Sequence, residues 1–164
     1  MRVYTLKCEL MAPVSMQEAF AVFQDPYNLA RLTPPWLGFR IVTQGVEMRQ
    51  GAEMEYRLRW MGVPLHWKTV ITEYEPPFYF VDEAVKSPYV LWRHRHTFRP
   101  TLEGTAVVDE VNYALPFGWI GRAAHTLAVG KQLERIFAFR QQAIAELIGG
   151  TVRQVRQPVI TAEK

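Results

Sequence analysis

Hydrophobic and polar positions alternate along most of the chain between residues 38 and 114, with the period of two that is typical of strands. In the clearest segment, Met54, Tyr56 and Leu58 fall on one face and charged residues fall on the other. Turn signals rich in glycine and proline divide this alternating region. The pattern predicts six strands in a meander, over residues 38–43, 52–60, 63–75, 78–84, 89–99 and 104–114.

The N-terminal part combines a strand with two short helices. Residues 3–11 alternate in the same way and predict the first strand of the sheet. Ser15 and Glu18 have the spacing of a capping box, which predicts a helix over residues 16–24. A second short helix is expected over residues 27–32, before the proline pair that ends it.

A long segment from about residue 120 to residue 148 has helical spacing and closes with Gly149-Gly150, a helix C-cap signal. No other predicted element is large enough to cover the dry face of the sheet. The sequence therefore predicts an α+β, helix-grip fold, in which a curved seven-stranded antiparallel sheet wraps around a long C-terminal helix and two short helices follow strand one. Residues 1–150 form one domain without a linker, and residues 151–164, which contain Pro158, are expected to be a C-terminal tail.

Composition narrows the function classes. Apolar residues make up 49% of the chain and aromatic residues 13%, so a large aromatic set must line either a solid core or a cavity. The net charge of +3 is scattered, which argues against a nucleic-acid partner. Cys8 has no partner cysteine and is expected to be a buried, unreactive thiol. With neither a targeting segment nor a membrane span in the pattern, we expect a cytoplasmic protein.

Several short motifs are shared with a known superfamily. They are Asn28-Leu29 with Leu32-Thr33-Pro34-Pro35-Trp36-Leu37, Tyr56-Arg57-Leu58-Arg59 with Gly62-Val63-Pro64 and Trp67, Phe80-Val81-Asp82, Pro88-Tyr89 with Trp92, His94, His96 and Phe98, and Gly104-Thr105 with Asp109, Tyr113 and Leu115-Pro116-Phe117-Gly118. With them the chain resembles the ligand-binding SRPBCC or START-like superfamily, and within it bacterial proteins labelled cyclase/dehydrase or cell division inhibitor. The resemblance covers residues 1–148 and implies a helix-grip fold with a ligand cavity between sheet and helix.

Strict alternation turns His94 and His96 toward the long helix, and a short hairpin near residues 101–104 sets Asp109 opposite them. Four interpretations of this trio are open: a self-satisfied buried cluster, polar recognition of a ligand, acid-base catalysis, and a metal site with Asp109 as third ligand. For the metal site, the spacing is the only signal, so neither a metal nor another cofactor is expected. Arg140 could pair with Asp109 or with Asp82.

Two further histidines are not expected to join the trio. His66 alternates outward, and His125 lies near the start of the long helix.

The inward face of the sheet supplies the candidate ligand-binding residues. They are Met54, Tyr56, Trp60, Trp67, Trp92, His94, His96, Phe98, Asp109 and Tyr113. The apolar members could equally be a solid core. Small helix residues opposite them, namely Ala123, Ala124, Ala128 and Gly130, favour a cavity.

Two loops, 33–39 and 115–121, are unusually apolar. If Trp36, Phe117 and Trp119 are exposed, they would form a portal rim or contact a membrane or a protein partner. Alternatively, the loops fold back and plug the end of the sheet.

Three functions remain open from the sequence. The first is binding of an apolar small molecule such as a lipid, a quinone or a polyketide-like compound. The second is a polyketide cyclase/dehydrase type of enzyme that uses His94, His96 and Asp109 for proton transfer. The third is an interaction module that uses the two apolar loops. Whether the protein is an enzyme stays open at this point.

Overall fold

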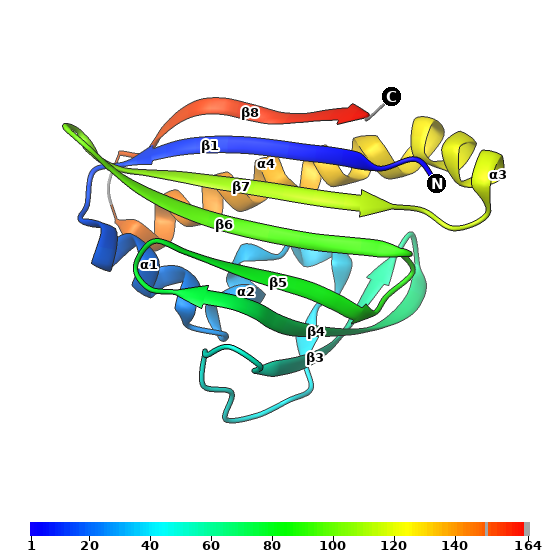
Figure 1. Cartoon of the computed structure of the whole chain (residues 1–164), viewed down its shortest axis with the longest axis horizontal. Coiled ribbons are helices and arrows are strands. Elements are labelled where there is room, and N and C mark those ends of the chain that lie inside the picture. The colour runs from blue at the N-terminus through cyan, green and yellow to red at the C-terminus, as the bar shows by residue number, and fades with distance from the viewer. Residues whose placement is uncertain (150, 163–164) are drawn as a thin grey trace.

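Eight antiparallel strands form one curved sheet in the order β2-β3-β4-β5-β6-β7-β1-β8, in the computed structural model that describes residues 1–149 and 151–162 (Figure 1). The strands are β1 (Tyr4–Ala12), β2 (Arg40–Ile41), β3 (Glu53–Trp60), β4 (Val63–Glu75), β5 (Tyr79–Lys86), β6 (Leu91–Thr101), β7 (Gly104–Ala114) and β8 (Arg153–Ala162). The helices are α1 (Met16–Gln24), α2 (Asn28–Leu32), the 3-10 turn η1 (Pro35–Leu37), α3 (Gly118–Ala124), the π-helical turn η2 (His125–Val129) and α4 (Gly130–Ile148).

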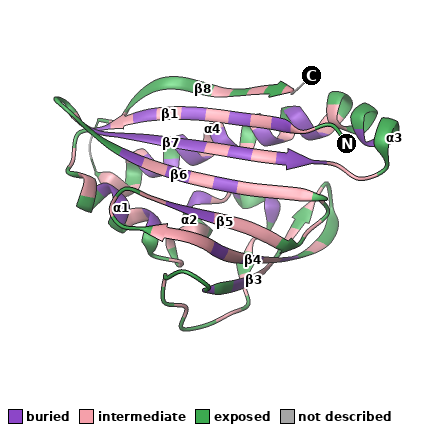
Figure 2. Cartoon of the chain, viewed as in Figure 1, coloured by how far each residue is buried: buried purple, intermediate pink, exposed green. Residues whose placement is uncertain are grey.

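One face of the sheet is covered by α4, which runs along it, and α1 lies near one end of the sheet (Figure 1). Burial follows the alternation of the strands: in β1 every second residue is buried (Figure 2). The capping box at Ser15 and Glu18 forms as predicted. The curved antiparallel sheet and the long helix across it confirm the helix-grip fold predicted from the pattern.

Cys8 is buried in β1, as predicted. Burial raises the pKa of its thiol, which leaves it protonated and unreactive.

The core consists of two apolar clusters under α4. The first lies against α1 and includes Phe20, Phe23, Phe98, Val107 and Ile144. The second includes Leu6, Val111, Leu133 and Phe137. Along β7, Asp109 falls between Val107 of the first cluster and Val111 of the second. The polar residues that follow therefore lie where the two apolar clusters meet.

The C-terminal segment corrects the expected strand count from seven to eight. Residues 151–164 were expected to be a tail, but Arg153–Ala162 forms β8 and pairs with β1. Its side chains are mostly exposed, so it carries no dry face that an alternating pattern would reveal. The backbone groups at the edge of β1 hold it instead, because an edge strand offers unpaired N–H and C=O groups.

Three smaller differences concern element bounds. The strand expected over 38–43 is reduced to β2, and the single long helix expected from residue 120 is interrupted by η2. Gly149 ends α4 in a left-handed conformation, as its C-cap pattern predicts, whereas Gly150 lies outside the described residues. Within the described residues, no helix is long and apolar enough to cross a membrane.

The side chain of Gln141 links α4 to the edge of the sheet. The pairing of β1 with β8 is irregular around Glu9, which leaves backbone carbonyls there without regular ladder partners. Gln141 is 2% exposed, and its Nε2 donates to the carbonyl of Arg156 at 3.1 Å and to that of Glu9 at 3.4 Å. The side-chain amide of Gln141 thus donates hydrogen bonds to one carbonyl of each strand where their pairing is irregular.

Replacing Gln141 with alanine should lower the free energy of unfolding by about 1–3 kcal/mol, since it removes two hydrogen bonds that a buried amide makes to backbone carbonyls. Amide exchange should also accelerate in β8. The matched control is Gln142→Ala, because Gln142 is exposed on the same helix. Equal chemical denaturation curves for the two variants would contradict this role of Gln141.

Candidate functional site

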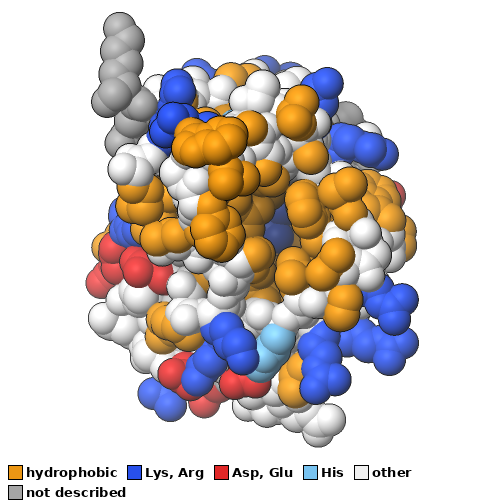
Figure 3. Space-filling model, turned by 90° about the vertical axis from the view of Figure 1, so that its right-hand side faces the viewer, with side chains coloured by type: hydrophobic (Ala, Val, Ile, Leu, Met, Phe, Trp, Pro, Cys, Tyr) orange, Lys and Arg blue, Asp and Glu red, His pale blue; other side chains and the backbone are white. Residues whose placement is uncertain are grey.

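A cavity of about 260 Å³ lies between the sheet and α4. Its walls come from β3, β4, β5 and β6, from the α2–η1 region and from one face of α4. Figure 3 shows the face of the molecule where hydrophobic side chains surround a hollow, with Lys and Arg side chains beside them. The volume is close to the lower end of small-molecule sites, which span roughly 300–1,000 Å³.

Most of the candidate ligand-binding residues line this cavity. Seven of the ten do so: Met54, Tyr56, Trp60, Trp67, Trp92, His94 and His96. The other three lie behind the wall. Phe98 packs against Phe20 and Phe23, and Tyr113 lies with its hydroxyl 2.7 Å from His125 Nε2. Asp109 is 3% exposed and contacts the histidines from the side away from the cavity.

The helix contributes to the cavity in a different way from the expected one. Ala123 and Ala124 are exposed, and neither Ala128 nor Gly130 lines the cavity. Larger residues do so instead: Val129, Leu133, Ile136, Phe137 and Arg140. The prediction from small residues was wrong. Ala123 and Ala124 belong to α3, which extends past the end of the strands (Figure 1), and Gly130 lies against the side chain of His125. The space comes from the curvature of the sheet over α4.

Two antiparallel registers bring the polar residues together. His94 on β6 lies opposite Asp82 on β5, and His96 lies opposite Asp109 on β7. The two imidazole rings lie side by side, with centroids 3.8 Å apart and planes tilted by 40°. The prediction that Asp109 faces the histidine pair is confirmed, and Asp82 joins from the other side.

Each carboxylate contacts both imidazoles. Asp109 Oδ1 lies 2.9 Å from His94 Nε2 and 2.8 Å from His96 Nδ1. Asp82 Oδ2 lies 3.0 Å from His96 Nε2 and 3.6 Å from His94 Nδ1. The contact of His96 Nδ1 with Asp109 is short, but it is not aligned as a hydrogen bond. The four side chains form a closed cluster with little exposure to solvent.

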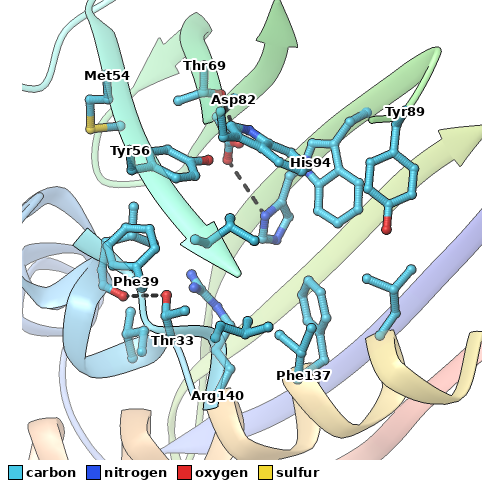
Figure 4. A pocket seen from close by; sticks show the side chains of 18 of the residues that line it. Thr33, Phe39, Met54, Tyr56, Thr69, Asp82, Tyr89, His94, Phe137 and Arg140 are labelled. Atoms are coloured by element: carbon cyan, nitrogen blue, oxygen red, sulfur yellow. Dashed lines mark hydrogen bonds and ion pairs between the residues drawn. The ribbon is translucent and has the colours of Figure 1, made fainter. Parts of the chain in front are cut away.

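Arg140 completes the cluster from the helix. Its side chain extends from α4 into the cavity, toward His94 and Asp82 (Figure 4). Arg140 Nε lies 3.7 Å from Asp109 Oδ2, which makes an ion pair without a hydrogen bond. The prediction that Arg140 pairs with an acidic residue of the sheet is confirmed for Asp109.

The charges set the protonation of the cluster. Two carboxylates and one guanidinium leave one negative charge, so a single proton on the histidine pair makes the cluster neutral, as a buried site requires. Burial and the neighbouring His96 lower the pKa of His94. Burial alone would lower the pKa of His96 too, but the close Asp109 and Asp82 carboxylates outweigh it and raise the pKa. His96 is therefore the imidazolium of the pair.

Both carboxyl groups stay ionised. Burial acts to raise their pKa values, but positive neighbours outweigh it. Arg140 and the two histidines hold the pKa of Asp109 well below its ordinary value. Hydrogen bonding to His96 and the charges around it lower the pKa of Asp82.

Sequence reasoning did not place Asp82 in the site, although a signal was present. The alternation of Phe80 with Asp82 in β5 puts both on the inward face, and Phe80 is indeed stacked on His96. His66 lies outside the cluster, as predicted, and contacts Glu55 on the outer face at 3.1 Å.

In the two apolar loops, residues 33–39 and 115–121, the large aromatic side chains are exposed. Trp36 is 49% exposed, Phe117 78% and Trp119 70%. These side chains do not plug the end of the sheet, which leaves the portal and partner interpretations as predictions.

Comparisons with known proteins agree with this architecture. A protein-family model described as "Polyketide cyclase / dehydrase and lipid transport" matches residues 12–138. A search of curated protein sequences finds no significant match.

Solved structures share the fold at low sequence identity. Protein CV1439 from Chromobacterium violaceum is 12% identical with a TM-score of 0.70, over 90% of this chain and 99% of that chain. A norcoclaurine synthase from Thalictrum is 14% identical with a TM-score of 0.64, over 90% and 96% of the two chains. The di-domain ARO/CYC StfQ from the steffimycin biosynthetic pathway is 13% identical with a TM-score of 0.64, over 90% of this chain and 49% of that one.

Replacing Asp109 with asparagine should lower the free energy of unfolding by about 3–5 kcal/mol, since only Asp82 then remains to balance Arg140 and the imidazolium, and one buried positive charge is left uncompensated. The matched control is Glu110→Gln, which removes a partly exposed ion pair with Lys7 and should cost less than about 1 kcal/mol.

The same pair of variants has a pH signature. Because the folded-state pKa of Asp109 is lowered, its stabilisation is present above the ordinary pKa of 3.8 and is lost as the pH falls below that value. The difference between wild type and Asp109→Asn should shrink in that range. A difference that does not change with pH would contradict the ionised state of Asp109.

Proposed function

Because this chain belongs to the polyketide cyclase/dehydrase and lipid transport family, we propose that it holds an apolar small molecule in the cavity between the sheet and α4. A lipid, a quinone or a polyketide-like compound fits this description. The observation that carries the proposal is the composition of the walls: most of the lining side chains are aromatic or aliphatic, and the buried polar groups gather in one patch, formed by Asp82, His94, His96 and Arg140. A site of this kind binds by apolar contact and orients its ligand through a few polar groups.

Arg140 is the anchor for the polar end of the ligand. It is 8% exposed, and its Nε is a buried donor that makes no hydrogen bond within the described residues. A guanidinium carries five N–H donors, and a buried donor without an acceptor is costly. A carbonyl, carboxylate or phenolic oxygen of the ligand would supply the missing acceptor beside His94.

Native mass spectrometry of the protein purified from its own host tests this proposal, followed by organic extraction. One apolar molecule per chain is the expected result, because the cavity is enclosed largely by apolar side chains. A variant that fills the cavity provides the decisive comparison. Leu65 lines the cavity from β4, so Leu65→Trp should reduce the bound fraction at least about tenfold through lost space.

The neighbouring His66 supplies the matched control, because it points to the outer face of the same strand. His66→Trp should carry the molecule as the wild type does. Loss of the molecule in both variants, or in neither, would count against this cavity as the binding site.

A second candidate function is the cyclase/dehydrase type of enzyme. Two imidazoles, each in contact with carboxylates, stand at the wall of an apolar cavity, which is an arrangement suited to proton transfer. StfQ, one of the proteins with a similar fold, is described as an ARO/CYC protein, which supports testing aromatic polyketide-like substrates here.

His94→Gln separates the two functions, because glutamine keeps a polar side chain but cannot transfer a proton at neutral pH. The co-purified molecule and polyketide analogues are incubated with each protein and followed by mass spectrometry for cyclisation or loss of water. An enzyme would keep its affinity in this variant and lose turnover. Weaker binding with no turnover in either protein would favour the binding function alone.

A further inference from the structure

His96 is flanked by a carboxylate at each ring nitrogen. Its Nε2 lies 3.0 Å from Asp82 Oδ2 and its Nδ1 lies 2.8 Å from Asp109 Oδ1. A neutral imidazole has one N–H and one lone pair, so one of these two contacts would be repulsive. The site therefore requires a cation at His96, either a second ring proton or a metal ion that takes the place of the proton facing Asp82.

His94 presents a lone pair on the same side. Its Nε2 donates to Asp109 at 2.9 Å, which leaves Nδ1 without a proton in the neutral ring. That nitrogen lies 3.6 Å from Asp82 Oδ2, too far for a hydrogen bond. His94 is 6% exposed and lines the cavity, so its Nδ1 is an acceptor at the cavity wall without a hydrogen-bond donor among the described residues.

We propose that His94 Nδ1, His96 Nε2 and an oxygen of Asp82 bind one divalent transition-metal ion at the wall of the cavity. The ligand atoms of these three residues lie within 4.8 Å of one another. Ligands at 2.0–2.1 Å from a tetrahedral Zn²⁺ are about 3.3 Å apart. The two nitrogen–oxygen distances, 3.0 Å and 3.6 Å, lie on either side of that value, so small side-chain shifts complete the geometry.

Asp109 acts behind the ligands rather than as one of them. It contacts the ring nitrogens that face away from Asp82, His94 Nε2 and His96 Nδ1. This is the arrangement in which an outer carboxylate fixes the orientation and basicity of metal-binding histidines. The sequence alone offered Asp109 as the third ligand, whereas the register of β5 with β6 assigns that place to Asp82.

The fourth coordination position faces the cavity, because Asp82, His94 and His96 all line it and Asp109 does not. Two carboxylates, the guanidinium of Arg140 and a divalent ion leave one positive charge when both histidines are neutral. An anionic oxygen, such as a carboxylate, an enolate or hydroxide, would balance it. This statement about the ligand rests on the proposed function, whereas the metal site itself does not.

Cobalt is the probe of choice, because tetrahedral Co²⁺ has visible d–d absorption. Metal-stripped full-length protein is titrated with Co²⁺ and then with Zn²⁺. We expect saturation at one ion per chain and loss of the band as Zn²⁺ displaces cobalt. Asp82→Asn and His94→Gln should each abolish the saturable band, and Asp109→Asn should weaken the affinity about 10- to 100-fold.

The matched control is His66→Gln, since His66 and Glu55 form an imidazole–carboxylate pair on the outer face of the same sheet. Circular dichroism confirms that each variant is folded. A wild-type protein without a saturable band would overturn the proposal. So would a band that persists in both Asp82→Asn and His94→Gln, or one that disappears in His66→Gln.

Binding of the neutral fluorophore N-phenyl-1-naphthylamine is measured on the same samples. Fluorophore binding without a cobalt band would remove the metal site and leave the proposed function standing. A cobalt band without fluorophore binding would support the metal site and count against the proposed binding of an apolar ligand.

Discussion

The fold must keep a group of charges neutral inside an apolar interior. Asp82, Asp109, His94, His96 and Arg140 come from three strands and one helix, and they meet where the two apolar clusters of the core adjoin. A buried charge is tolerated only when it is paired. The register of β5, β6 and β7 and the position of α4 must therefore bring each of these charges next to an opposite one. The apolar clusters stabilise the fold, and the polar cluster makes its geometry specific.

A single charged residue in the apolar stripe of α4 completes this site. Leu133, Phe137, Arg140 and Ile144 follow one face of α4 at the spacing of a helical stripe. Only one of these positions is charged, and it lies beneath Asp109. The curved sheet stands far enough from this stripe to leave the cavity, so the polar patch lies at the wall of an apolar space. The same residues that satisfy one another's charges are therefore able to meet a ligand.

Alternation along the strands was enough to predict the helix-grip fold and the inward direction of His94 and His96. It did not reveal β8, whose side chains are mostly exposed and which is held by backbone pairing with β1. Nor did it place Asp82, because the pairing of β5 with β6 depends on turn geometry as well as on periodicity. Phe98 and Tyr113 face inward as expected but lie under the ends of α4, where the core is filled. A pattern tells which face a side chain is on, but not whether the space above it is occupied.

The central claim is that the cavity holds a ligand whose polar end meets Arg140 and His94. A crystal structure of the protein purified from its own host, without an added ligand, tests it most directly. The account predicts continuous density between the sheet and α4, with an oxygen within hydrogen-bond distance of the Arg140 guanidinium. A cavity closed by repacked side chains, with Arg140 bonded only to residues of the sheet, would contradict it.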